Sequence, residues 1–349
     1  MYGLSRSVLN KESRVKTAVS VLALAAGLTL SLPLLAESRT AYGPQLEGFS
    51  YPHPLKHYRF ESQGKALQMT FMDVAPTGKA NGRTALLLHG KNFCGATWER
   101  TIEVLSDAGY RVIVPDQVGF CSSSKPEGYQ FSFAQLAHNT QALLEQENIE
   151  QVTVIGHSMG GMLAARLALN YPQRVEQLVL VNPIGLEDWQ AEGVPYASID
   201  QLYQSELKTD FESIKAYQQK FYYNGNWKPE YDRWVGMLAG MYAGKGKELV
   251  AWNQAQTSEM VFTQPVIHEF PRIKTPTLLL IGGLDRTAPG ANRAPEDVAK
   301  RLGNYPELGR HAAAKIPDAT LVAFPDLGHS PQVEAPEAFH RALLEGLQR

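Results

Sequence analysis

Short apolar runs recur along this 349-residue chain, and longer stretches with helical spacing separate them. Each run is apolar at nearly every position, which is typical of strands that helices cover on both faces. The alternation predicts βαβ units around a mostly parallel sheet. The runs cover residues 85–88, 112–114, 152–155, 178–181, 277–281 and 320–324.

Two further strands and four helices complete the predicted body. Residues 57–61 and 66–74 are typical of an antiparallel opening pair, which brings the number of strands to eight. Helical spacing predicts the elements that flank the sheet. These predicted helices cover residues 97–108, 132–147, 160–170 and 333–347.

One long interval, residues 184–265, has no strand run and carries apolar and aromatic residues at mixed helical spacing. We expect a helical insertion here, and a smaller excursion over residues 288–317. Most aromatic side chains of the insertion should hold it together, while some should line an apolar pocket that favours acyl or aryl substrates over charged ones. The insertion holds four of the five tryptophans: Trp189, Trp227, Trp234 and Trp252.

Residues 1–36 are typical of a secretory signal: basic residues come first, residues 17–35 are almost wholly apolar, and Ala36 offers a small residue for cleavage. An uncleaved anchor is the alternative, because the apolar stretch could just span a bilayer. We therefore expect an exported, periplasmic or secreted protein without a stable membrane anchor after cleavage. The basic residues are Arg6, Lys11, Arg14 and Lys16.

The formal net charge of the whole chain is −2. A chain without a basic face or an acidic tract offers no electrostatic footprint for a charged polymer. We expect no nucleic-acid partner and a small-molecule substrate.

The strongest chemical signal is the run Gly156-His157-Ser158-Met159-Gly160-Gly161, which lies between a predicted strand and a predicted helix. A serine attacks only if its hydroxyl stands clear of the backbone, and a tight strand-to-helix turn achieves this. Glycines around the serine remove side chains that would collide in such a turn. The alternative is an incidental turn serine, but the position favours a nucleophile.

A nucleophilic serine needs donors for the negative charge that develops on the substrate oxygen. The backbone N–H of Met159 lies at a helix N-terminus, where unpaired donors and the helix dipole stabilise an anion. The loop that begins at His89-Gly90 offers a second donor, the N–H of Lys91 or, as an alternative, that of Asn92. We expect His89 to shape this loop and to transfer no proton.

The base and the acid should follow later strands. His329 comes after the last predicted strand, where neutral imidazole could accept the proton of Ser158. Asp285 follows the strand before it and would orient His329, which gives the chain order Ser, Asp, His. Asp326 is the competing acid, but three residues before the histidine it is better suited to bind its own loop.

These residues together resemble the α/β-hydrolase superfamily over nearly the whole chain after the signal. The resemblance implies an eight-stranded, mostly parallel α/β sheet flanked by helices, a helical cap after strand six, and a Ser-His-Asp triad that needs no metal and no cofactor. It divides the chain into residues 1–36 (signal), 37–183 (first part of the core), 184–265 (cap) and 266–349 (second part of the core). The matching segments are His89-Gly90, residues 115–120 with Ser122-Ser123-Ser124, residues 156–160, Asp285 and His329.

This chain departs from the patterns of several α/β-hydrolase subfamilies, and these departures narrow the range of expected activities. Serine at 158 argues against haloalkane dehalogenases and epoxide hydrolases, which carry aspartate there. The loop after His89-Gly90 lacks the Gly-Pro-Gly character of many C–C bond hydrolases, and Ser330 stands where those enzymes commonly have tryptophan. We expect a small to medium ester as substrate. The alternatives are a C–C or amide bond hydrolase with the same triad, and a binding protein on a hydrolase scaffold.

Cys94 and Cys121 are the only cysteines. In this fold the strands that precede them are neighbours, so both residues should lie in loops on the same side of the sheet. A disulfide that braces the two loops and a pair of free buried thiols are both compatible with the sequence.

Overall fold

The computed structural model describes residues 40–348 of the chain. The predicted signal, residues 1–36, lies outside the described residues. Within residues 40–348, no helix is both long enough and apolar enough to cross a membrane.

Eight strands form one sheet in the order β1-β2-β4-β3-β5-β6-β7-β8. β2 pairs antiparallel with β1 and with β4, and all other neighbouring strands are parallel. The predicted eight-stranded, mostly parallel sheet is therefore confirmed. The strands are β1 (Leu55–Ser62), β2 (Lys65–Val74), β3 (Thr84–Leu88), β4 (Arg111–Pro115), β5 (Val152–His157), β6 (Val175–Val181), β7 (Thr277–Gly282) and β8 (Ala319–Phe324).

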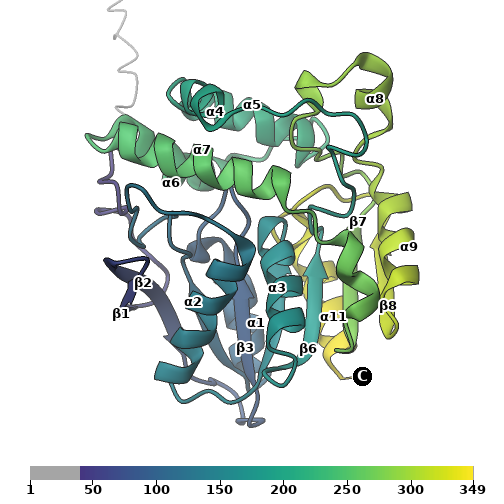
Figure 1. Cartoon of the computed structure of the whole chain (residues 1–349). Coiled ribbons are helices and arrows are strands. Elements are labelled where there is room, and N and C mark those ends of the chain that lie inside the picture. The colour runs from purple at the N-terminus through teal and green to yellow at the C-terminus, as the bar shows by residue number, and fades with distance from the viewer. Residues whose placement is uncertain (1–39, 349) are drawn as a thin grey trace, which may run out of the picture. The chain divides into compact units, whose positions relative to one another are not determined.

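Helices cover both faces of the sheet, which is why its strands are apolar at successive positions. α2 (Phe133–Gln146) and α3 (Met159–Asn170) lie on one face, and α1 (Glu99–Asp107) and α11 (Pro336–Leu347) lie on the other (Figure 1). In β3, Leu86 and Leu88 belong to the core on the side of α2 and α3, whereas Ala85 and Leu87 belong to the core on the side of α1 and α11. This alternation follows from the period of two in a strand.

Four α-helices come between β6 and β7, within the interval that has no strand run. They are α4 (Ile199–Glu206), α5 (Phe211–Phe221), α6 (Asp232–Ala243) and α7 (Lys247–Thr263), and we call them the cap helices. Figure 1 shows them above one end of the sheet. α8 (Glu296–Arg301) and α9 (Tyr305–Lys315) form the smaller excursion after β7. The remaining short helices are η1 (Gly95–Trp98), η2 (Pro229–Tyr231), η3 (Ile267–Arg272), η4 (Ala291–Arg293) and α10 (Pro331–Glu334).

Local sequence explains where several helices begin. The hydroxyl of Ser132 accepts the backbone N–H of Gln135 at 3.0 Å and caps α2. Ser198 and Gln201 form a reciprocal capping box at the start of α4.

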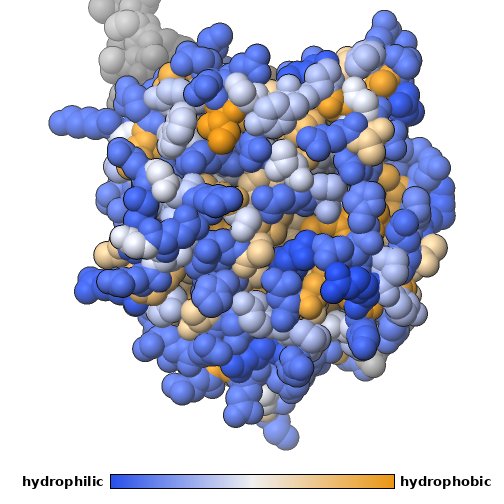
Figure 2. Space-filling model, in the orientation of Figure 1, coloured by the Kyte–Doolittle hydropathy of each residue, from blue (hydrophilic) through white to orange (hydrophobic). Residues whose placement is uncertain are grey.

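Figure 2 shows a mainly hydrophilic surface on the side of the molecule that Figure 1 faces. Among the described residues, Tyr196, 53% exposed, is the one large hydrophobic side chain that is open to solvent.

Candidate active site

Ser158 lies between β5 and α3 in a backbone conformation that few non-glycine residues adopt, with φ 56° and ψ −120°. Its N–H donates to Val181 O at 3.1 Å, and its carbonyl accepts the N–H groups of Gly161 and Ile184. These three backbone hydrogen bonds hold the strained turn. The predicted strand, turn and helix around Ser158 are all present.

The glycines of the turn are required by close packing. A Cβ on Gly156 would lie 2.2 Å from Gly160 O, and one on Gly160 would lie 2.1 Å from Leu88 O. Both distances are far below van der Waals contact. The turn can therefore form only because side chains are absent at these two positions.

His329 follows β8 and is fully buried. Its Nδ1 lies 2.6 Å from Asp285 Oδ2, so the imidazole donates from Nδ1 and keeps Nε2 as an acceptor. Nε2 makes no hydrogen bond with any residue that the structure describes. The ring packs against Tyr222 of the segment after α5 and against His157, with centroids 4.4 Å and 4.9 Å away. The candidate base thus lies beside the residue that precedes Ser158.

The backbone of His329 is also held. Its N–H donates to Tyr222 O at 2.8 Å, and its carbonyl accepts Nε2–H of His157 at 2.8 Å. Burial keeps the pKa of His157 well below its usual value, so His157 is neutral and serves as a structural donor. The sequence did not reveal either contact, because both partners are far from His329 along the chain.

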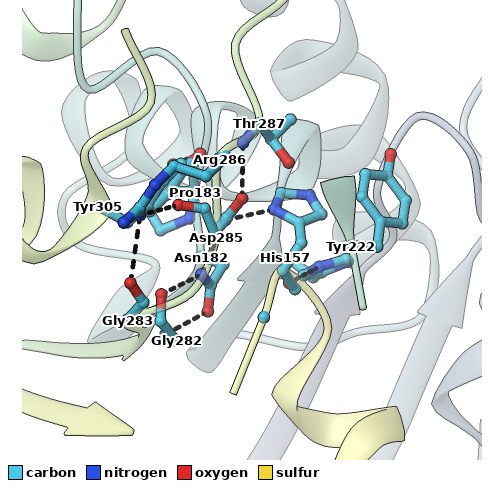
Figure 3. A network of polar contacts seen from close by, with 12 residues as sticks. His157, Asn182, Pro183, Tyr222, Gly282, Gly283, Asp285, Arg286, Thr287 and Tyr305 are labelled. Atoms are coloured by element: carbon cyan, nitrogen blue, oxygen red, sulfur yellow. Dashed lines mark hydrogen bonds and ion pairs between the residues drawn. The ribbon is translucent and has the colours of Figure 1, made fainter. Parts of the chain in front are cut away.

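Asp285 is the acid that contacts His329, and the competing Asp326 is exposed. The carboxylate of Asp285 also accepts Asn182 Nδ2 at 2.9 Å and the N–H of Thr287 at 2.8 Å (Figure 3). These two donors fix the orientation in which the carboxylate accepts the proton of His329 Nδ1. The sequence predicted no role for Asn182, because an asparagine directly after a strand is typical of an ordinary turn.

The two predicted backbone donors flank Ser158. A Cβ on Gly90 would lie 3.1 Å from Ser158 Cβ, so the loop after β3 passes directly beside the serine. No described residue accepts the N–H of Met159 or that of Lys91. The backbone N–H of Asn92, the alternative second donor, also has no acceptor among the described residues, and its side-chain amide donates to the Tyr222 hydroxyl at 2.9 Å. The N–H groups of Met159 and Lys91, and that of Asn92 as the alternative, are therefore unpaired and available to a substrate oxygen.

His89 shapes the loop, as the sequence indicated. The N–H of Gln117 donates to His89 Nε2 at 3.1 Å, so His89 Nδ1 carries the proton and donates to Gly90 O at 2.9 Å. Burial lowers the pKa of His89. The neutral ring thus links the loop after β3 to the loop after β4.

A disulfide joins the same two loops. Cys94 and Cys121 are bonded, with Cα atoms 5.8 Å apart, which decides between the two possibilities that the sequence left open. Asp116 accepts the N–H of Gly95 at 2.7 Å and the hydroxyl of Ser122 at 2.7 Å, so it reinforces the link. Cys94, Asp116 and Cys121 are also the one group of metal-type ligands close together among the described residues, but both sulfurs are taken by the disulfide.

A cavity of about 360 Å³ opens above Ser158, between the sheet and the cap helices. Its wall is mostly apolar, as predicted, yet it also contains the charged residues Lys91, Glu206 and Arg293. No tryptophan of the described chain lines it. The apolar and aromatic lining includes Ile214, Tyr217, Tyr222, Leu238, Met241, Val250, Val261 and Phe262.

Comparisons with known proteins agree with this architecture. A family model described as alpha/beta hydrolase fold matches residues 85–336. A crystal structure of a probable hydrolytic enzyme from Pseudomonas aeruginosa PAO1 is 63% identical, with a TM-score of 0.88 over 89% of this chain and 99% of that one.

Two curated relatives differ in how much of them is matched. A 2-hydroxy-6-oxononadienedioate/2-hydroxy-6-oxononatrienedioate hydrolase of Comamonas testosteroni is 26% identical over 76% of this chain and 88% of its own length. An AB hydrolase superfamily protein of Bacillus subtilis is 39% identical, but over 32% of this chain and 39% of its own length.

Proposed function

Since the chain belongs to the alpha/beta hydrolase fold family, we propose that it is an exported serine hydrolase that cleaves a small to medium carboxylic ester through an acyl-enzyme. The observation that carries this proposal is the buried His329–Asp285 pair beside the strained turn of Ser158. The pair leaves His329 Nε2 free to accept a proton.

In the proposed mechanism, Ser158 Oγ attacks the ester carbonyl and its proton passes to His329 Nε2. The N–H groups of Met159 and Lys91 stabilise the negative charge on the carbonyl oxygen. Collapse of the tetrahedral intermediate breaks the bond to the alcohol oxygen, which takes the proton from Nε2. Water, activated by the same imidazole, then releases the acid from Ser158. Asp285 keeps the imidazole in the correct tautomer throughout.

A second candidate is hydrolysis of a C–C bond by the same residues. The Comamonas testosteroni relative, named as a hydrolase of a hydroxy-oxo-dienedioate, favours this alternative. Ser330 and the loop from Lys91 to Phe93 differ from the pattern that such enzymes commonly carry, and these differences favour the ester.

The decisive assay combines a fluorophosphonate probe with p-nitrophenyl esters of graded acyl length. We expect the purified protein to be labelled once per chain and to turn over the esters, with a preference set by the cavity. Labelling with no ester turnover, together with cleavage of a 2-hydroxy-6-oxo-dienoate, would favour the C–C alternative. A protein that is neither labelled nor active on either substrate would contradict the mechanism itself.

Export rests on residues 1–36 and is supported by the Cys94–Cys121 disulfide, since structural disulfides persist mainly in oxidising compartments. We expect the protein recovered from the periplasm or medium to begin near Glu37 when its N-terminus is sequenced. A protein that keeps Met1 and sediments with membranes would favour the uncleaved anchor.

A further inference from the structure

The cavity above Ser158 is elongated. α7 contributes lining residues at positions 250, 254, 258, 261 and 262, which lie along one face of the helix. At a rise of about 1.5 Å per residue, this face extends for about 18 Å. Such a cavity suits an elongated substrate whose two ends lie far apart.

Two cationic side chains line the cavity at different levels of α7. Beside the middle of α7, Lys91 Nζ lies 2.8 Å from Gln254 Oε1 and 3.4 Å from Glu206 Oε1. Glu206 also accepts the hydroxyl of Tyr242 at 2.5 Å. The positive charge of Lys91 is therefore neutralised by the protein itself.

Arg293, beside Phe262 near the C-terminal end of α7, has no such partner. No Asp or Glu within residues 40–348 lies close enough to form an ion pair with it, and partial burial lowers the pKa of its guanidinium. Its Nε donates to Pro195 O at 3.3 Å, and its Cζ lies 5.3 Å from the centre of the Phe262 ring. These contacts hold the side chain and leave its charge without a carboxylate partner.

The turn before Arg293 leaves room for its guanidinium because it contains a glycine. Gly290 has φ 84°, and a Cβ there would lie 2.7 Å from Arg293 Nη2. The N–H of Arg293 donates back to Gly290 O at 2.9 Å, which closes the turn. The guanidinium therefore lies across a backbone that has no side chain, at the wall of the cavity that contains Ser158.

We propose that Arg293 binds a carboxylate of the substrate, so that the preferred substrates are esters that carry a free carboxylate away from the scissile bond. A guanidinium presents two parallel donors that match a carboxylate, and such charged hydrogen bonds are stronger than those between neutral groups. A carboxylate monoanion neutralises the single charge of Arg293, whereas a phosphate dianion would leave a net negative charge in a mainly apolar wall. This inference rests on the proposed ester hydrolysis.

The test compares p-nitrophenyl half-esters of dicarboxylic acids of increasing length with their primary amides, which have nearly the same shape and no charge. We expect wild-type kcat/KM to favour the acid over the amide by about ten- to hundredfold at the best length, mainly through KM. A parallel pair of esters carries the carboxylate or the amide on the alcohol side, and it locates Arg293 relative to the two substrate arms.

Three variants separate binding from structural support. Arg293→Met should lower kcat/KM for the acid much more than for the amide, so that the preference for the acid is lost, and Arg293→Lys should retain part of the preference. Arg301→Met is the matched control, because Arg301 lies outside the cavity lining and pairs with Glu192 and Asp297.

Two results would overturn the inference. One is a wild-type protein that turns over neutral esters with no preference for a carboxylate on either side, a result that needs no variant and leaves ester hydrolysis intact. The other is Arg293→Met lowering acid and amide turnover alike, which would make Arg293 a structural residue. Absence of all ester turnover and of fluorophosphonate labelling would instead contradict the proposed function.

Discussion

Ser158→Ala is expected to lower kcat for every ester that the protein cleaves by about a millionfold. The reason is that alanine removes the atom that forms the bond to the acyl group. Among the described residues, the other serines that line the cavity, Ser213 and Ser258, lie on the cap helices α5 and α7. The residual rate should come from binding and from the backbone N–H donors alone.

Steady-state kinetics and mass spectrometry of the fluorophosphonate adduct measure this effect. Ser258→Ala is the matched control, since it deletes a hydroxyl from the wall of the same cavity and should keep both labelling and most of the turnover. Fluorophosphonate labelling that persists in Ser158→Ala would refute the assignment of the nucleophile.

Asp285→Asn should lower kcat by about ten-thousandfold with little change in KM. An asparagine amide that turns its N–H₂ group toward His329 Nδ1 stabilises the tautomer with the proton on Nε2, and that tautomer cannot accept the serine proton. The N–H of Thr287 donates to Oδ1 of the present carboxylate and favours this wrong orientation, because it would then pair with the new carbonyl oxygen. Asn182 Nδ2 donates to Oδ2, the oxygen that also meets His329, and would lose its acceptor.

Asp326→Asn provides the comparison. It makes the same chemical change three residues before His329, on an exposed side chain. We expect it to keep near wild-type activity. The opposite pattern, with Asp285→Asn active and Asp326→Asn inactive, would reverse the choice of acid.

The strands and the site could be predicted together because both depend on local sequence. A buried strand needs a continuous apolar run, and Ser158, Asp285 and His329 each follow one such run. In a parallel sheet the carboxyl ends of these strands meet at one edge. Knowing which runs are strands therefore also predicts which polar residues come close together.

The supporting contacts could not be predicted in this way. Asn182 reaches Asp285 across 103 positions of the chain, and an asparagine after a strand is common in turns. The backbone contact of Tyr222 with His329 depends on how a cap segment packs on the sheet. The same holds for Glu206, which meets Lys91 inside a cavity that composition alone predicted to be apolar.

The Cys94–Cys121 bond has a consequence for how the chain matures. Because the whole sequence has two cysteines, one intramolecular pairing exists and scrambled isomers cannot form. The pairing of β3 with β4 places the loops behind these strands side by side, so the folded chain holds the two sulfurs within reach of each other. The one incorrect product of oxidation is therefore a cross-link to another molecule. Non-reducing electrophoresis would separate such cross-linked chains from correctly oxidised monomers, and a count of free thiols would measure the chains that are still reduced.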